Sequence, residues 1–158
     1  MYHQWWRFVW VYQDIYPDEL ELKLEHAGRH ATFLNLDITI KEGIFVYKLF
    51  DKRDAFPFSI VRMPHVDSNI PESIFYSALV GEFLRIARST LLHEDFVVKA
   101  KSLCQRMHSQ GANSIKMRRS LLRIVKRHEP EFVRFQRSSD VLIQEVICNA
   151  WMFRRFDI

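Results

Sequence analysis

The chain has few of the residues on which common phosphate-binding and metal-binding motifs depend. Its 158 residues include four glycines, all separated, so no glycine-rich phosphate-binding loop is expected. Its two cysteines, Cys104 and Cys148, stand far apart without a CxxC motif or a histidine at metal-ligand spacing. That spacing argues against a zinc site, and we expect both to be reduced thiols on apolar helix faces.

Long apolar runs are also missing. A secretory signal needs an aliphatic core after a charged start, and a membrane-spanning helix needs about twenty apolar residues. The chain instead begins with five aromatic residues between Tyr2 and Trp10, with His3 and Arg7 among them. We therefore expect no membrane span, and without a targeting signal we expect a cytoplasmic or nuclear location.

The composition that is present favours a small folded protein with a polyanionic partner. Hydrophobic residues make up 48% of the chain, enough for one domain with a core or for two small subdomains. The formal net charge is +4. A basic balance favours partners such as nucleic acid, although many proteins without one are mildly basic.

The N-terminal third predicts a small antiparallel sheet. Apolar and polar residues alternate over residues 34–40, and residues 44–50 are rich in β-branched and aromatic residues. Lys41, Glu42 and Gly43 form the turn between these two strands. A third strand is predicted where leucines alternate with charged residues over 20–24, with 27–30 as the connection.

The C-terminal half predicts helices. Residues 57–71 form an irregular crossover, in which Pro71 occupies the first helical turn and Asn69 or Ser68 caps it. Helices are predicted over 72–91, 94–110 and 113–128, with Gly111 as a stop, and a last one begins at Ser138 or Ser139. The fold class is therefore α+β, a small three-stranded antiparallel sheet followed by a three- to four-helix bundle.

Spacings of three and four predict which side chains of these helices face the core. The first helix points Arg85 and Arg88 outward. The predicted inward residues are Phe75, Leu79, Phe83, Ile86, Phe96, Val97, Ala100, Leu103, Cys104, Met107, Ile115, Leu121, Leu122 and Val125, with Phe132, Val133 and Phe135 packing back.

The strongest candidate for a binding surface is a row of basic residues in the third predicted helix. Side chains three and four residues apart meet on one helix face. We call this row the cationic ridge, and it comprises Lys116, Arg119, Arg123, Lys126 and Arg127. Such a ridge suits closely spaced phosphates, and binding would be salt-dependent and largely blind to sequence. The alternative is a solvated helix face without a partner.

Several segments recur in the order of a known family. IYPDELEL is followed by FLNLDITIKEGIFVYKLFDKRDAFPF, then HVDSNIPES, then EFLRIARST with EDF after it. This order, over residues 15–128, resembles the segment after the catalytic motif in reverse transcriptases of eukaryotic retroelements, the Penelope-like and related non-retroviral branches. The chain departs from the family pattern at Asn35, where an acidic residue is usual, and over 77–81.

The resemblance implies a division of the chain into parts of a polymerase. Residues 1–56 would be a partial palm remnant, in which Lys41, Glu42 and Gly43 form a primer-grip-like turn. Residues 57–71 would be the crossover and 72–158 a helical, thumb-like domain. The implied partners are an RNA or DNA template-primer and an upstream palm domain, with Lys52 and Arg53 near the nucleic-acid cleft and the cationic ridge on the thumb.

The catalytic centre of that family has no counterpart in this sequence. Its polymerases hold two magnesium ions between paired aspartates, which position the attacking hydroxyl and stabilise the leaving phosphate. No Asp-Asp pair occurs here, and Asp14 and Asp18 are isolated residues of the kind usual in turns and caps. We therefore expect no catalytic residue, metal site or cofactor in this chain, since the Mg²⁺ would belong to the missing palm.

Three functions remain open on this basis. The first is a reverse-transcriptase fragment without catalytic aspartates and with residual binding of the template-primer backbone. The second is a non-enzymatic helical protein-interaction module, which exposed aromatic residues at both ends would serve. The third is a decayed retroelement copy without function.

Overall fold

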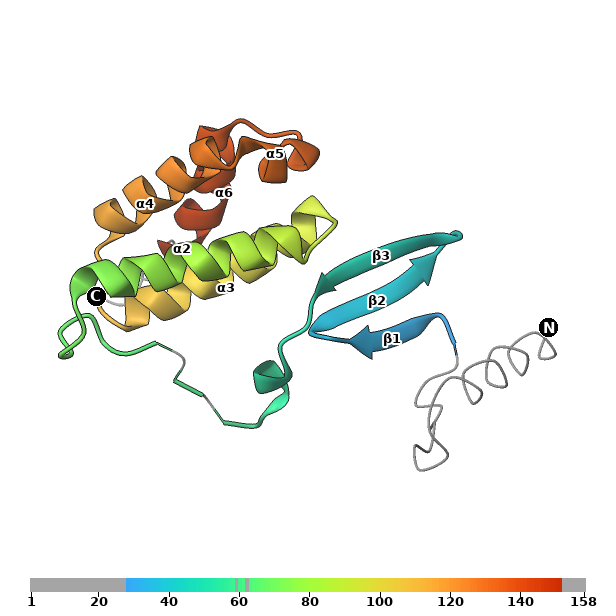
Figure 1. Cartoon of the computed structure of the whole chain (residues 1–158), viewed down its shortest axis with the longest axis horizontal. Helices are drawn as coiled ribbons and strands as arrows, with labels where there is room; N and C mark the ends of the chain where they lie inside the picture. The colour runs from blue at the N-terminus through green and yellow to red at the C-terminus, as the bar shows by residue number, and fades with distance from the viewer. Residues whose placement is uncertain (1–27, 59, 62, 152–158) are drawn as a thin grey trace, which may run out of the picture.

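The computed structural model describes residues 28–58, 60–61 and 63–151, and it has the α+β architecture expected from the sequence (Figure 1). Three strands come first, and helices follow. The strand predicted over 20–24, the aromatic start of the chain, Asp14, Asp18 and the aromatic residues beyond 151 lie outside the described residues.

The sheet is an antiparallel meander. It consists of β1 (His30–Phe33), β2 (Leu36–Lys41) and β3 (Ile44–Leu49), in the order β1-β2-β3. Two residues with positive φ form each turn, Leu34 and Asn35 in the first and Glu42 and Gly43 in the second. Such turns suit the right-handed twist of a hairpin, and they account for the tight connections.

The first strand of this sheet differs from the prediction. Residues 27–30 were predicted as a linker, but His30 begins β1, and the strand predicted over 34–40 begins only at Leu36. The alternation of apolar and polar residues continues through Leu34 and Asn35, which concealed the turn. Their φ values of 44° and 66° are left-handed, a conformation that asparagine adopts readily and leucine rarely. Lys41, predicted in the second turn, ends β2.

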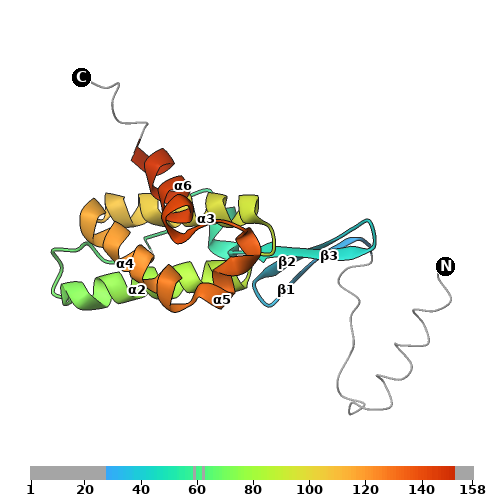
Figure 2. The same cartoon turned by 90° about the horizontal axis from the view of Figure 1, so that it is seen from above.

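Four long helices follow the short helix η1 (Lys52–Ala55). They are α2 (Glu72–Arg88), α3 (His93–Ser109), α4 (Ser114–Arg127) and α6 (Ser139–Trp151). Each of the four packs against two others, because α2 and α6 both contact α3 and α4. The short α5 (Glu129–Phe132) and η2 (Val133–Phe135) connect α4 to α6. The described helices therefore form a bundle with α2 diagonally opposite α6 (Figure 2).

Local signals determine where these helices begin and end. Gly111 follows α3 with φ +87°, and a Cβ there would lie 2.7 Å from Val66 Cγ1, so its role as a stop is confirmed. The Asn113 side chain caps α4 by accepting hydrogen bonds from the backbone N–H groups of Ile115 and Lys116. At α2 the prediction is wrong, because Pro71 is itself the cap residue and no side chain caps the helix.

Four phenylalanines from α2, α3, α5 and η2 pack together inside the bundle. The Phe96 ring stacks on Phe135 with centroids 4.6 Å apart and meets the edge of Phe83 at 5.4 Å. Phe132 stacks on Phe83 at 5.7 Å. Aromatic contacts of this kind stabilise a core beyond the area they bury. Phe96 is fully buried between the other three, so it connects α3 to the turn before α6.

Most predicted core positions are buried, with two clear exceptions. Ile115 and Val133 are each 62% exposed. Ile115 lies beside the buried face of α4 and not on it. That face consists of Met117, Leu121, Ile124 and Val125. Met117 and Ile124 were not predicted, because the basic residues around them concealed the apolar spacing. Val133 points out of the short η2, whose neighbours Phe132 and Phe135 fill the core.

Among the described residues, the sheet joins the bundle only at one end. Leu49, at the end of β3, is buried in the core, and Leu91 N–H donates a hydrogen bond of 2.9 Å to the Tyr47 carbonyl. The rest of the sheet projects beyond the helices in both views (Figures 1 and 2). The turn of Glu42 and Gly43 lies at the far tip.

Replacing Phe96 with alanine should lower the free energy of unfolding by about 3–5 kcal/mol, because it removes a fully buried ring from the aromatic cluster. Urea denaturation followed by circular dichroism measures this change. Phe58→Ala is the matched control, since Phe58 is 63% exposed and its loss should cost less than about 1 kcal/mol. Equal losses for the two variants would contradict the assigned core.

The thiol of Cys104 should react only when the protein opens. Burial raises the pKa of Cys104 to about 12, which keeps it protonated at neutral pH, and the thiolate is the reactive form. In a Cys148→Ser background, labelling by a disulfide reagent should be on the order of a thousandfold slower in native than in denatured protein. Rapid labelling of the native protein would show that α3 is not packed as described.

Candidate nucleic-acid interface

The structure places the cationic ridge on one solvent-facing side of α4. Successive residues of a helix are about 100° apart, so the five ridge residues fall within an arc of about 100°. The buried Met117, Leu121, Ile124 and Val125 lie on the opposite side. All five ridge residues are exposed, and from Lys116 to Arg127 the ridge is about 17 Å long. The packing of α4 thus determines which way the ridge faces.

Only one member of the ridge has a carboxylate partner within the described part of the chain. Lys116 Nζ donates to both carboxylate oxygens of Glu72, at 2.7 and 2.9 Å, which joins the start of α4 to the start of α2. The hydrogen bond to Glu72 raises the pKa of Lys116. The side chains of Arg119, Arg123, Lys126 and Arg127 form no hydrogen bond or ion pair there.

Arg118 differs from the ridge in place and in partners. Its guanidinium lies 3.8 Å from the Asp140 carboxylate at the start of α6, on the flank of α4 that faces that helix. Arg118 has the same chemistry and the same helix as Arg123, but it points about 140° away from it. The two arginines therefore offer a natural comparison between a ridge position and a flank position.

Lys52 and Arg53, which the resemblance put near the nucleic-acid cleft, lie in η1. Asp51 caps this helix, and its carboxylate accepts hydrogen bonds from Arg53 N, Nε and Nη2 at 2.9–3.0 Å. Side chains on both sides of Arg53 then define a cavity of about 110 Å³ between η1, α2 and α3. No residue of α4 lines it. The structure therefore does not bring Arg53 and the cationic ridge together at one site.

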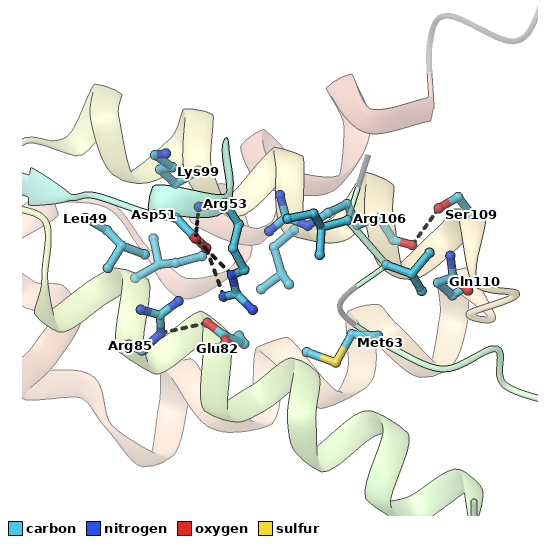
Figure 3. A pocket seen from close by; sticks show the side chains of 14 residues that line it. Leu49, Asp51, Arg53, Met63, Glu82, Arg85, Lys99, Arg106, Ser109 and Gln110 are labelled. Atoms are coloured by element: carbon cyan, nitrogen blue, oxygen red, sulfur yellow. Dashed lines mark hydrogen bonds and ion pairs between the residues drawn. The ribbon is translucent and has the colours of Figure 1, made fainter. Parts of the chain in front are cut away.

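The cavity brings together basic residues that no local sequence pattern groups (Figure 3). Arg53, Arg85, Lys99 and Arg106 line it, against the acidic Asp51 and Glu82. Arg85, predicted to point outward, has a side chain that is 38% exposed, and its Nε donates to Glu82 at 2.8 Å on the cavity wall. These residues come from three separate elements, so only the folded chain brings them together. The lining carries an excess of positive charge and is held by ion pairs.

The turn predicted to resemble a primer grip is remote from both basic regions. Lys41, Glu42 and Gly43 lie at the free tip of the hairpin, which projects away from the helices (Figure 1). A strand of this length spans about 20 Å. All three residues are exposed, and nothing among the described helices approaches this tip.

His30, His65 and His93 take part in ion pairs, and no histidine of the described residues belongs to a metal-binding cluster. No three His, Cys, Asp or Glu side chains of the described residues lie close enough to hold a metal ion. The Nε2 atom of His93 lies 2.8 Å from the Glu145 carboxylate of α6, and Arg137 Nε lies 3.5 Å from the other oxygen of that carboxylate. This cluster joins the start of α3 to α6.

Across the part of the chain that the structure covers, no helix is long and apolar enough to cross a membrane. No protein-family model matches the chain, and neither a curated protein nor a solved structure shows significant similarity to it.

Proposed function

We propose that the chain is a reverse-transcriptase-related segment that holds the backbone of a template-primer duplex through its cationic ridge. The catalytic aspartates and their Mg²⁺ would be supplied by a palm domain outside this chain. The ridge then contributes affinity without base recognition, because contacts to phosphates carry no sequence information. The observation that carries this proposal is that four of the five basic side chains along one face of α4 have no partner among the described residues.

The spacing of the ridge suits a nucleic-acid strand. Phosphates of one strand of duplex DNA rise by about 3.4 Å each, so a ridge about 17 Å long runs beside about five of them. A protein that neutralises phosphates releases bound counterions, and that release drives binding at low salt. The ridge supplies the charges, and Arg119, Arg123, Lys126 and Arg127, which have no partner among the described residues, are available for these contacts.

The cost of the ridge to the folded chain supports a role in binding. Like charges at spacings of three and four destabilise a helix by about 0.2–0.5 kcal/mol per pair. Arg123 has three such neighbours, because Arg119 lies four residues before it and Lys126 and Arg127 lie three and four residues after it. The negative end of the helix dipole compensates only for the last turn, where Lys126 and Arg127 lie. A solvated face without a partner would gain nothing from this arrangement.

Neutralising Arg123 should weaken binding and reduce its salt dependence. In Arg123→Gln, the slope of log K against log salt for a hybrid RNA–DNA duplex should fall by about 0.9, the equivalent of one phosphate contact. Gel shifts across a salt series measure the slope. Arg118→Gln is the matched control, with the same net charge and the same helix, and its slope should match the wild type. Absent binding at low salt, or equal effects of the two substitutions, would refute the proposal.

Removing the partner of Lys116 should strengthen binding. Glu72→Gln takes a negative charge away from the ridge and releases the Lys116 ammonium, so affinity at low salt should rise by about threefold. Glu82→Gln is the control, because it removes a carboxylate from the same helix at the cavity wall. The same gel shifts compare the two, and an equal gain in both variants would indicate net charge alone, not the ridge.

A further inference from the structure

One face of the sheet consists of apolar side chains from all three strands. Alternate residues of a strand point to opposite faces, and paired residues on neighbouring strands share a face. The observed register puts Ile38 beside Ala31 and Tyr47, and Ile40 beside Phe45. We call the resulting set the apolar sheet face, and its members are Ala31, Phe33, Leu36, Ile38, Ile40, Phe45, Tyr47 and Leu49.

The opposite face is mainly polar. His30 contacts Asp37 there, and Lys48 lies 3.8 Å from the other Asp37 carboxylate oxygen. Thr32, Thr39 and Lys41 complete its polar part, with Ile44 and Val46 as its apolar members. A sheet with this asymmetry is the kind that normally buries one face and leaves the other in water.

The described helices bury only the end of the apolar sheet face. Leu49 is 4% exposed, but Phe33 is 63% and Phe45 65% exposed. Leu36, Ile38, Ile40 and Tyr47 are half-buried. The face is about 20 Å long and about 10 Å wide between its outer strands, which gives a patch on the order of 200 Å². Three strands need cover on their apolar face for independent stability, and the described helices supply it only at Leu49.

We propose that the apolar sheet face is covered by residues 5–12 of the same chain, with Trp5, Trp6, Phe8 and Trp10 as the contacting side chains. These residues lie outside the described part of the chain, which begins two positions before β1. The segment is therefore attached at the edge strand of the very sheet whose face lacks cover. This inference is separate from the nucleic-acid proposal, because the ridge lies on α4 and contributes nothing to the sheet.

Chain length and composition both fit this occupant. The 18 residues from Trp10 to Gly28 span at most about 60 Å when extended, several times the length of the face, so the segment can fold back over it. Tethering gives the segment an effective concentration of about millimolar, which a second copy at micromolar concentration cannot match. Large aromatic side chains also bury the most apolar area per residue, and Arg7 is the only Lys, Arg, Asp or Glu between residues 1 and 13.

Tryptophan fluorescence tests the proposal in the full chain. A Trp151→Phe background leaves Trp5, Trp6 and Trp10 as the reporters. Phe45→Glu should shift their emission to longer wavelength and raise the acrylamide quenching constant by about twofold or more, because it places a charge on the covered face. Ile44→Glu is the matched control, since Ile44 is equally exposed, at 65%, but lies on the opposite face. Unchanged emission in Phe45→Glu, or equal shifts in both variants, would overturn the proposal.

Labelling of cysteines introduced into the sheet is a second test, which remains informative if Phe45→Glu unfolds the sheet. In a Cys148→Ser background, the thiol of Phe45→Cys should label on the order of tenfold faster when Trp5, Trp6, Phe8 and Trp10 are all replaced by serine. The thiol of Ile44→Cys should label at the same rate with and without the four serine substitutions. No acceleration at position 45, or protection that disappears on dilution and therefore comes from a second copy, would refute cover by the chain's own segment.

Discussion

The orientation of α4 is the constraint on which the position of the cationic ridge depends. Met117, Leu121, Ile124 and Val125 bury one side of the helix against α2 and α6, and the ridge must then face water. The same packing holds Lys116 near Glu72 and Arg118 near Asp140, so α4 is tied to both neighbours by charge at its rims. A rotation of α4 by one residue would bury basic side chains without partners, which is far more costly than leaving them exposed.

The aromatic cluster holds α4 at that orientation through the segment that follows the helix. α4 runs directly into α5 and η2, whose Phe132 and Phe135 pack on Phe83 and Phe96. Outside the cluster, Arg88 donates to Glu131 at 2.7 Å, and this hydrogen bond raises the pKa of Arg88 and lowers that of Glu131. That pair is exposed and contributes little to stability. Ring packing, not the surface ion pair, therefore fixes the end of α4.

The helices could be predicted from sequence because their evidence is local. Spacings of three and four, Gly111 as a stop and residues that start a helix all act within a few positions, and the observed bounds follow them closely. The turn at Leu34 and Asn35 was missed because its left-handed backbone leaves no mark on an alternating pattern. Periodicity also did not predict that Ile115 lies beside the buried face of α4, because basic residues occupy most of the helix and obscure the apolar spacing.

The cationic ridge, the cavity and the apolar sheet face also differ in how far local sequence patterns predict them. The cationic ridge is a property of one helix, so spacing alone could place its residues together. The cavity of Arg53, Arg85, Lys99 and Arg106 unites three elements that are distant in sequence, and no local pattern predicts such a meeting. The apolar sheet face stands between these cases, because strand alternation predicts its members, but only the register and the exposure of Phe33 and Phe45 show that it is incompletely covered.

The attachment of the sheet at one end makes two surfaces of the molecule independent. Leu49 and the Leu91–Tyr47 hydrogen bond hold β3 to the bundle, whereas the face of Ile38, Ile40 and Phe45 extends away from it. A segment or domain that covers that face therefore has no reason to block α4. Such a protein can bury the apolar sheet face and keep the cationic ridge in water, because the first lies on the three strands and the second on α4.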